Sequence, residues 1–251
     1  MKNRIAHIVM TPFLGLGDFN PDNQWFLNRI RIFKRYTQES LRKQNTEFLH
    51  LMSFRPEDEQ NPIMANFCSD LNFYPLFSGL LYWDDRFVEE SEKNRRLADR
   101  LEKLNEIKKF CEDADWIYFT RLDSDDMFHK DAFQEIQSQE PKEKTAFIFQ
   151  NGYIFNKKTA EIAEWNPTTC PPFYTICFPK DVFFDGKKHN EYMKGWKSHE
   201  DTVKIFNPVY MSDCSSNRKY CVLVHGKNTS TTWDHRFKGK MVDSNLINDF
   251  I

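Results

Sequence analysis

The first half of the chain alternates continuous apolar runs with stretches of helical periodicity. Runs at 5–10 (IAHIVM), 47–54 (EFLHLMSF) and 115–122 (DWIYFTRL) predict buried strands. Between the first two runs, a loop rich in Gly, Pro, Asn and Asp at 12–23 precedes residues 24–44, whose apolar side chains fall close to helical spacing. The chain is therefore expected to begin with a β-α-β unit.

A longer helix is predicted at residues 84–112. Its apolar side chains recur at steps of three and four, at Leu97, Leu101, Leu104, Ile107 and Phe110. The charged residues between them are typical of a solvated helix face. This helix leads into the strand at 115–122, and a group of aspartates follows directly.

The second half is richer in strands than the first. Residues 145–156 and 159–166 predict a hairpin, 173–180 another strand, 198–206 the start of a short helix, and 219–226 a last strand. An alternating half followed by a β-rich half predicts an α/β fold with an open mixed sheet, Rossmann-like in its first half. The ligand of such a sheet is expected beyond the carboxyl ends of its strands. Because no linker or repeat interrupts the chain, we expect a single domain over 1–251.

Composition narrows the classes of function. With 35 Lys and Arg against 37 Asp and Glu, the chain has no overall basic surface, and nucleic acid is not favoured as a partner. No apolar run approaches the roughly 18 to 20 residues of a membrane-spanning helix. The six cysteines lack a CxxC pair and fit neither a zinc site nor a disulfide framework. We therefore expect a cytoplasmic protein with reduced cysteines.

The stretch FTRLDSDDMFHKD, residues 119–131, places four aspartates within nine residues after an apolar run. An EF-hand loop beginning at Asp123 would require Gly and Glu where Phe128 and Gln134 stand. A haloacid-dehalogenase-type phosphatase is a weak rival, because Met127 stands where that pattern has Thr or Val. The third interpretation is a strand-end Asp-x-Asp element that holds a divalent cation against a diphosphate. Capping of a nearby helix by the same aspartates is the purely structural alternative.

Two later stretches extend this pattern. Glu200 and Asp201 follow His199 where a helix is expected to begin, and His225 ends the last predicted strand. Each has a structural explanation of its own, since acidic residues are favoured in a first helical turn. Together with the Asp-x-Asp element they form the set that metal-dependent glycosyl transfer requires. A cation held by carboxylate and imidazole neutralises a leaving diphosphate, and a carboxylate takes the proton of the acceptor hydroxyl.

The chain resembles the bacterial and viral rhamnosyltransferases among the GT-A-fold glycosyltransferases. The resemblance is carried by HIVMTPF, NRIRIFKRYTQESLRKQ, FTRLDSDDMFHKD, SHEDTVKIF and YCVLVHGKNTSTTW, which span nearly the whole chain. It implies a GT-A-like fold in which 1–126 form the nucleotide-sugar-binding half and 127–251 the acceptor and catalytic half. The first loop departs from the family pattern, because Pro12 stands where an arginine is expected. That departure leaves the donor contact at this point, and the identity of the sugar, open.

The resemblance also implies roles for the acidic residues and the histidine. Asp201 would be the catalytic base of an inverting transfer, and Glu200 would bind the acceptor or orient the base. Asp125 would hold Mn²⁺ or Mg²⁺, Asp126 would support it, and His225 would complete the metal shell.

The donor-binding residues follow from the same resemblance. Thr11 would lie near the nucleotide and Asp123 would contact the nucleoside side of the donor. Arg121 and Lys227 flank these motifs and would meet the diphosphate. The expected partners are a nucleoside-diphosphate sugar and a glycan or other hydroxyl-bearing acceptor, with a modified nucleobase still open as acceptor.

Two other functions compete with this one. A carbohydrate- or metal-binding module would keep the fold and lose turnover. A sugar nucleotidyltransferase would show a Gly-rich phosphate loop, for which the GLG at 15–17 is too little. The residues after His225 predict a loop followed by a short docking segment, and we expect that loop to close over the donor as a lid. A disordered tail is the alternative.

Overall fold

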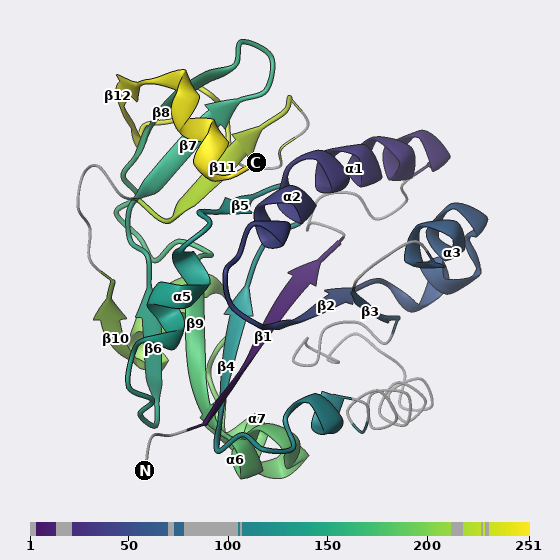
Figure 1. Ribbon diagram of the computed structural model, residues 1–251, viewed down its shortest axis with the longest axis vertical. Coiled ribbons are helices and arrows are strands. Elements are labelled where there is room, and N and C mark those ends of the chain that lie inside the picture. Colours follow the sequence, from purple (N-terminus) through teal and green to yellow (C-terminus); the bar gives the residue numbers. More distant parts are fainter. Residues whose placement is uncertain are drawn as a thin grey trace.

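The computed structural model describes residues 4–13, 22–69, 73–77, 105, 107–211, 218–226, 228 and 231–251. Seven strands form its first sheet: β1 (Ile5–Pro12), β2 (Leu49–Ser53), β3 (Tyr74–Leu76), β4 (Trp116–Arg121), β6 (Thr145–Ile148), β9 (Tyr174–Pro179) and β10 (Asn207–Tyr210). Their order is β10-β6-β9-β4-β1-β2-β3 (Figure 1). Strands β1 to β4 are mutually parallel, whereas β9 is antiparallel to both of its neighbours. The carboxyl ends of β1 and β4 therefore meet at one edge of the sheet.

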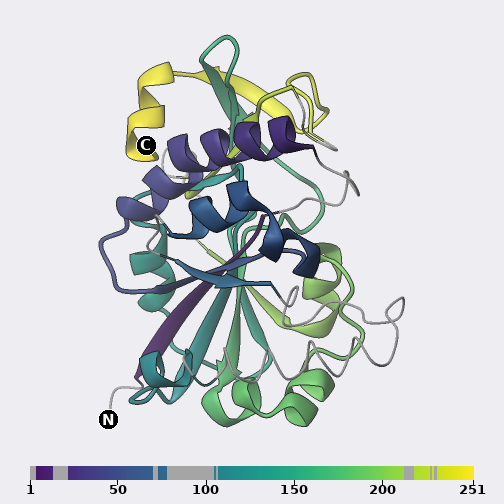
Figure 2. The same ribbon diagram turned by 90° about the vertical axis from the view of Figure 1, so that its right-hand side faces the viewer.

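A second sheet contains the remaining strands: β5 (Met127–Phe128), β7 (Gly152–Asn156), β8 (Glu161–Trp165), β11 (Tyr220–Val224) and β12 (Lys238–Val242). Their order is β12-β8-β7-β11-β5. Figure 2 shows this sheet and α1 (Asn23–Arg35) at one end of the molecule, with α6 (Lys180–Phe184) and α7 (Gly186–Tyr192) at the other. The predicted mixed α/β fold with an open mixed sheet is confirmed.

The predicted hairpin at 145–166 is only partly correct. The β7–β8 pair is an antiparallel hairpin, but β6 belongs to the first sheet. The chain crosses between the sheets at 149–151, where Phe149 is buried and donates its main-chain N–H to the carbonyl of Phe173 at 3.1 Å. Residues 145–156 thus supply one strand to each sheet.

The remaining helical elements are short. They are α2 (Thr37–Arg42), α3 (Pro62–Ser69), α5 (Ala132–Gln137) and α8 (Thr202–Ile205), with 3₁₀ turns η1 (Pro56–Gln60), η3 (His199–Asp201) and η4 (Ser244–Asp249). The helix predicted at 24–44 is thus α1 and α2, separated at Tyr36. Most of the helix predicted at 84–112 lies outside the described residues, although 107–110 are helical. No helix in the described part of the chain is long and apolar enough to cross a membrane.

An aromatic core holds α1 against the first sheet. Phe26 and Phe33 of α1 are almost fully buried, and they pack with Phe13 and Phe54 from the ends of β1 and β2. Burial of each such ring contributes on the order of 1.5–3 kcal/mol. The core therefore fixes which face of α1 is turned toward the carboxyl ends of the strands.

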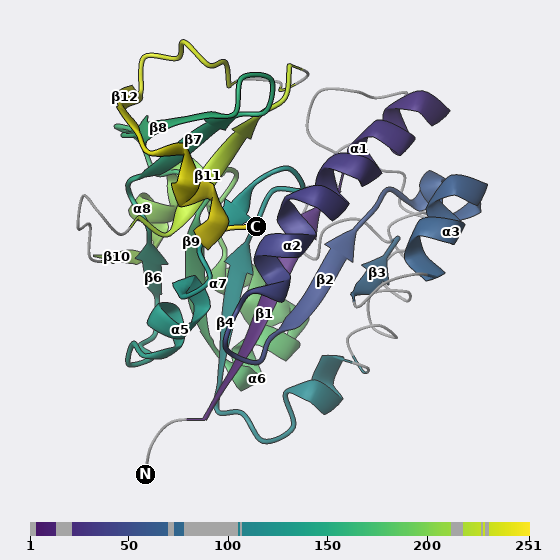
Figure 3. The same ribbon diagram turned by 45° about the horizontal axis from the view of Figure 1, so that its top comes forward.

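The described part of the C-terminal stretch is built into the fold. β12 pairs with β8, and Phe250 is completely buried. The chain then reaches the end of α2 (Figure 3), where Lys43 Nζ donates to the carbonyls of Asn248 and Ile251 at 2.7 and 2.5 Å. The predicted docking segment is therefore present, whereas closure of residues 229–240 over a donor stays a prediction.

Candidate active site

Asp125 lies in the loop that follows β4, and it is held there by an arginine from α1. Arg29 Nη1 donates to Asp125 Oδ2 at 2.8 Å and Nη2 donates to Oδ1 at 3.1 Å. Arg29 Nε donates to Ser124 Oγ at 3.0 Å. All three nitrogens of one guanidinium therefore bind this loop, and the paired side chains are only 12% and 13% exposed.

The position of Arg29 follows from the construction of α1. Asp22 caps the helix by accepting the main-chain N–H of Trp25 at 2.7 Å. Phe26 and Phe33 lie three residues before and four residues after Arg29, so all three share one face of the helix. The burial of both rings consequently directs Arg29 toward the strand ends. Sequence reasoning missed this residue, although a charged side chain on the apolar face of a helix is a usable signal.

His225, at the end of β11, contacts the same carboxylate. Its Nε2 lies 3.0 Å from Asp125 Oδ2 and 3.4 Å from Arg29 Nη1. Asn228 fixes the turn, because its Oδ1 accepts the His225 N–H at 2.8 Å and its Nδ2 donates to the Leu223 carbonyl at 2.6 Å. We refer to Arg29, Asp125 and His225 as the Asp125 centre. It brings together two of the three residues predicted to hold a metal.

Electrostatics keep Asp125 ionised. Burial opposes its charged form, but the Arg29 guanidinium and the His225 ring outweigh burial and hold the pKa of Asp125 below its ordinary value. The Asp125 carboxylate is therefore anionic at neutral pH, paired with Arg29.

Asp126, the third predicted metal residue, has a different environment. Its Oδ1 accepts the main-chain N–H of Leu223 at 3.1 Å, which ties the loop to β11. Burial, followed by the nearby Asp125 and Asp123 carboxylates, raises the pKa of Asp126 well above its ordinary value. Its observed contact is with the second sheet, and it thereby supports the position of Asp125.

The Asp125 centre contains two side chains of the kind that bind divalent cations, a carboxylate and an imidazole. Asp125 Oδ2 and His225 Nε2 lie 3.0 Å apart in a hydrogen bond, so the two side chains face each other. Carboxylate and imidazole both suit Mn²⁺. Among the described residues, however, no cluster of three or more His, Cys, Asp or Glu side chains could hold a metal. A cation here would need further ligands from outside that set.

Arg121 and Asp123 form a second pair at the end of β4. Arg121 Nε donates to Asp123 Oδ1 at 3.1 Å, and Nη2 lies 3.0 Å from the same oxygen. Tyr174 of β9 also hydrogen-bonds Arg121, and burial raises the pKa of Tyr174 to about 12. Arg121 and Asp123, two of the four predicted donor-binding residues, therefore lie together at the end of β4 and are half-buried.

Thr11 lies deeper than the Arg121–Asp123 pair. Thr11 is fully buried, with its Oγ1 2.9 Å from Nε2 of His50, and burial lowers the pKa of His50 to about 3. Thr11 thus belongs to the floor beneath the strand ends. Lys227 lies outside the described residues.

The predicted catalytic residues form a local cap. Ser198 and Asp201 make a capping box at η3, in which Asp201 Oδ2 accepts the main-chain N–H groups of Lys197 and Ser198 at 3.2 Å. Lys204 Nζ donates to Asp201 Oδ1 at 2.9 Å, and this bond is the main cause of the lowered pKa of Asp201. Glu200 is exposed. We refer to residues 198–201 as the capping turn.

His199 links the capping turn to the strand ends. Burial lowers the pKa of His199, the positive charge of Arg121 lowers it further, and the Asp123 carboxylate opposes that effect. The turn therefore lies within electrostatic reach of the Arg121–Asp123 pair. The Asp125 centre, the Arg121–Asp123 pair and the capping turn contain six of the nine predicted site residues, and Asp126, Thr11 and Lys227 lie outside these three groups.

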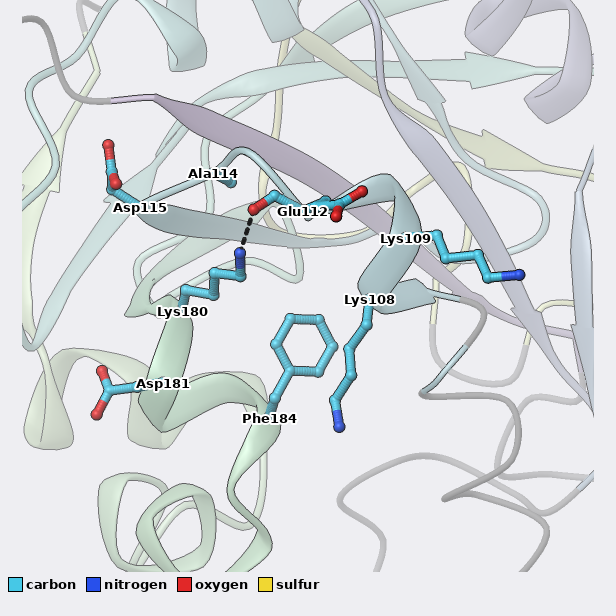
Figure 4. A pocket seen from close by; sticks show the side chains of 8 residues that line it. All are labelled: Lys108, Lys109, Glu112, Ala114, Asp115, Lys180, Asp181 and Phe184. Atoms are coloured by element: carbon cyan, nitrogen blue, oxygen red, sulfur yellow. Dashed lines mark hydrogen bonds between the residues drawn. The ribbon is translucent and has the colours of Figure 1, made fainter.

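A hollow of about 690 Å³ lies elsewhere, at the opposite edge of the first sheet (Figure 4). Asp115 precedes β4 and Lys180 follows β9, so the hollow is at the end of the strands remote from Asp125. Figure 4 shows Lys180 hydrogen-bonded to the carbonyl of Glu112 within this hollow. Its lining mixes lysines with carboxylates and gathers none of the predicted site residues.

Comparison with known proteins gives a distant structural likeness. No family model matches the chain, and no curated protein matches its sequence. A crystal structure of S. aureus TarS 1–349, a GT-A glycosyltransferase, is similar with a TM-score of 0.38 and 15% identity. The match covers 87% of this chain and 60% of that chain, so this chain spans less than two thirds of its length. The likeness is too distant to indicate an activity.

Proposed function

We propose that this protein is a metal-dependent glycosyltransferase that moves a sugar from a nucleoside-diphosphate donor to an acceptor hydroxyl. The observation that carries the proposal is the Asp125 centre, where a buried carboxylate and an imidazole lie 3.0 Å apart beyond parallel strand ends. Ligands of open α/β sheets bind at this edge. Rhamnose is our candidate sugar, on the family resemblance alone.

The cation would be Mn²⁺ or Mg²⁺. Asp125 and His225 would hold it, and when bound it would neutralise the charge that develops on the leaving diphosphate. Asp126 would support this pair through its bond to the Leu223 N–H. Because the described residues offer only two such ligands side by side, we expect the cation to bind weakly until diphosphate oxygens are present.

The neighbouring pair would bind the donor. Asp123 would contact the nucleoside side, and the Arg121 guanidinium, already oriented by Asp123, would face the diphosphate. Thr11 would form part of the floor beneath the nucleotide, and Lys227 remains our expected second diphosphate contact.

Asp201 would be the catalytic base. The acceptor oxygen forms a bond to the anomeric carbon, the bond from that carbon to the diphosphate breaks, and the acceptor proton passes to an Asp201 oxygen. Its lowered pKa keeps Asp201 ionised at neutral pH, as a base must be, but it also limits the strength of that base. Glu200, exposed beside it, would bind the acceptor or orient the base. A single displacement of this kind inverts the anomeric centre.

A binding module without turnover is the second candidate. The observation that favours it is the capping box, because the contacts of Asp201 with Ser198 and Lys204 already give it a structural role. Such a module would bind sugar nucleotides and release nothing.

A panel of nucleotide sugars incubated with Mn²⁺ separates these functions. We expect at least one donor to raise the melting temperature and to release nucleoside diphosphate when an acceptor is supplied, with an inverted product by NMR. Binding without release would support the module. A panel in which no nucleotide sugar binds would contradict both functions.

A further inference from the structure

Arg29 lies beside both residues that are proposed to hold the cation. Its Nη1 is 2.8 Å from Asp125 Oδ2 and 3.4 Å from His225 Nε2, so one nitrogen is close to both predicted ligands. The second nitrogen of the fork binds the other oxygen of the same carboxylate at 3.1 Å. The arginine therefore neutralises the charge that would attract a metal ion.

Other contacts hold Arg29 in this position. The Arg29 guanidinium is anchored to Ser124 Oγ at 3.0 Å, and Ser124 is itself held by its bond to the Phe13 carbonyl at 3.0 Å. The helix that carries it is packed through Phe26 and Phe33. A bidentate arginine–carboxylate pair with little exposure is among the stronger ion pairs in proteins.

A free divalent ion must compete with this guanidinium. Two cations within about 4 Å repel each other where solvent is largely excluded, so the pairing of Arg29 with Asp125 lowers the affinity of this carboxylate for a free ion. Release of Arg29 without a new anionic partner would leave a poorly solvated charge. A diphosphate supplies such a partner, because its oxygens match the fork of an arginine.

We propose, on the basis of the cation site proposed above, that Arg29 is a resident counter-ion that excludes free divalent cations from Asp125 and His225. The ligand that the site captures is then the complex of a divalent cation with a nucleoside diphosphate. Arg29 leaves Asp125 when that complex arrives. The site thereby selects its donor together with its metal and ignores the ion alone.

Direct binding of Mn²⁺ tests this role. Calorimetry is done with Mn²⁺ alone on the wild type, Arg29→Gln, Arg29→Lys and the control Arg31→Gln, which changes an exposed arginine two residues along α1. We expect Arg29→Gln to bind Mn²⁺ about tenfold more tightly than the wild type or more, equivalent to roughly 1.4 kcal/mol. Arg31→Gln should match the wild type, and Arg29→Lys should stay close to it because the charge is kept.

Two results would overturn the inference. One is an Arg29→Gln affinity for Mn²⁺ no greater than that of the wild type, in a protein whose circular dichroism shows it is folded. The other is an Arg29→Lys affinity equal to a raised Arg29→Gln affinity, which would show that charge is not the cause. If Arg29→Gln fails to fold, Arg29→Lys is compared with the wild type instead. A lysine variant that binds free Mn²⁺ about tenfold more tightly than the wild type would contradict exclusion by charge.

A second titration separates this inference from the proposed function. Mn²⁺ is added to the same proteins in the presence of uridine or thymidine diphosphate. Suppose that the wild type does not bind Mn²⁺ in the presence of either nucleotide, and that no variant binds Mn²⁺ at all. The proposed metal site itself then fails. If the wild type binds the complex and Arg29→Gln is no tighter for the free ion, only the role of Arg29 fails.

Discussion

Asp125 and Asp201 are both carboxylates with a lowered pKa, yet the structure holds them in opposite ways. Asp125 is bound by Arg29 and His225, which lie 96 and 100 positions away in sequence, in a nearly buried centre. Asp201 is bound by residues three and four positions away, and its partner Lys204 is 68% exposed. Contacts within a few residues explain the lowered pKa of Asp201. The contacts of Asp125 form only when three segments that are distant in sequence come together.

The difference distinguishes a carboxylate that stabilises the fold from one that is available for binding or catalysis. A helix cap stabilises a turn by about 1 kcal/mol and needs no further purpose. A largely buried ion pair gives little net stability, because the cost of desolvation offsets the attraction. A perturbed carboxylate beyond the ends of parallel strands is therefore a better marker of function than one in a capping box.

The largest effect is expected from Asp125→Asn. The amide keeps the shape of the side chain but removes the anionic ligand, so metal-dependent binding of a nucleoside diphosphate should be lost. Calorimetry with and without Mn²⁺ measures this loss, with Asp113→Asn as the control because Asp113 is 94% exposed and remote from the site. Unchanged affinity in the Asp125 variant would remove it from the metal site.

Asp201→Asn tests whether Asp201 is the catalytic base. If Asp201 is the base, turnover should fall by roughly 10²- to 10⁴-fold while donor binding is retained. Steady-state rates and donor affinity are measured on the same preparation, and Glu191→Gln, which changes a 74% exposed carboxylate of α7, serves as the control. A variant with nearly full turnover would leave Asp201 with its capping role alone.

Acid should reveal two buried histidines of the first sheet, His7 in β1 and His50 in β2. Burial lowers the pKa of His50 and of His7 from 6.5 to about 3, so the unfolded chain takes up these protons first. The two neutral, buried histidines contribute fully to the free energy of unfolding above pH 6.5. This contribution is lost as the pH falls toward 3, at about 1.4 kcal/mol per pH unit for each histidine. Urea unfolding of wild type and His50→Gln at a series of pH values should show a shallower slope for the variant. Equal slopes would mean that His50 titrates alike in both states.

The smallest effect is expected from Ser198→Ala. This change removes the Ser198 hydroxyl from the capping box but leaves the Asp201 carboxylate in place. We expect about 1 kcal/mol lower stability and turnover close to that of the wild type. A large loss of turnover with unchanged stability would instead show that the cap orients Asp201 for catalysis.

The sequence predicted the central strands because β1, β4 and β11 are continuous apolar runs. It could not separate β6 from β7, since the polar residues between them look the same whether the chain turns back or crosses to another sheet. β10 and β12 were not predicted, because every residue of β10 is exposed and β12 is mostly polar. Edge strands such as these are defined by their partners and carry little pattern of their own.

The site was predictable to a similar degree. Strand-end positions marked Asp125 and His225, the family resemblance assigned both to one metal shell, and the fold does bring them together. Arg29 was missed, because the charges of an amphipathic helix are usually assigned to solvent. Its partner lies 96 positions away, and no local pattern encodes that distance.

The wide spacing of the Asp125 centre also sets the order of events on a folding chain. Its three members come from a helix near residue 29, a loop near 125 and a strand that ends at 224, so a ribosome-bound nascent chain cannot assemble it before β11 has emerged. The capping turn, closed within a few residues, can form within about a microsecond in an isolated segment. Capture of a ligand at Asp125 would thus report that both sheets have docked, which makes it a functional readout for the completion of folding.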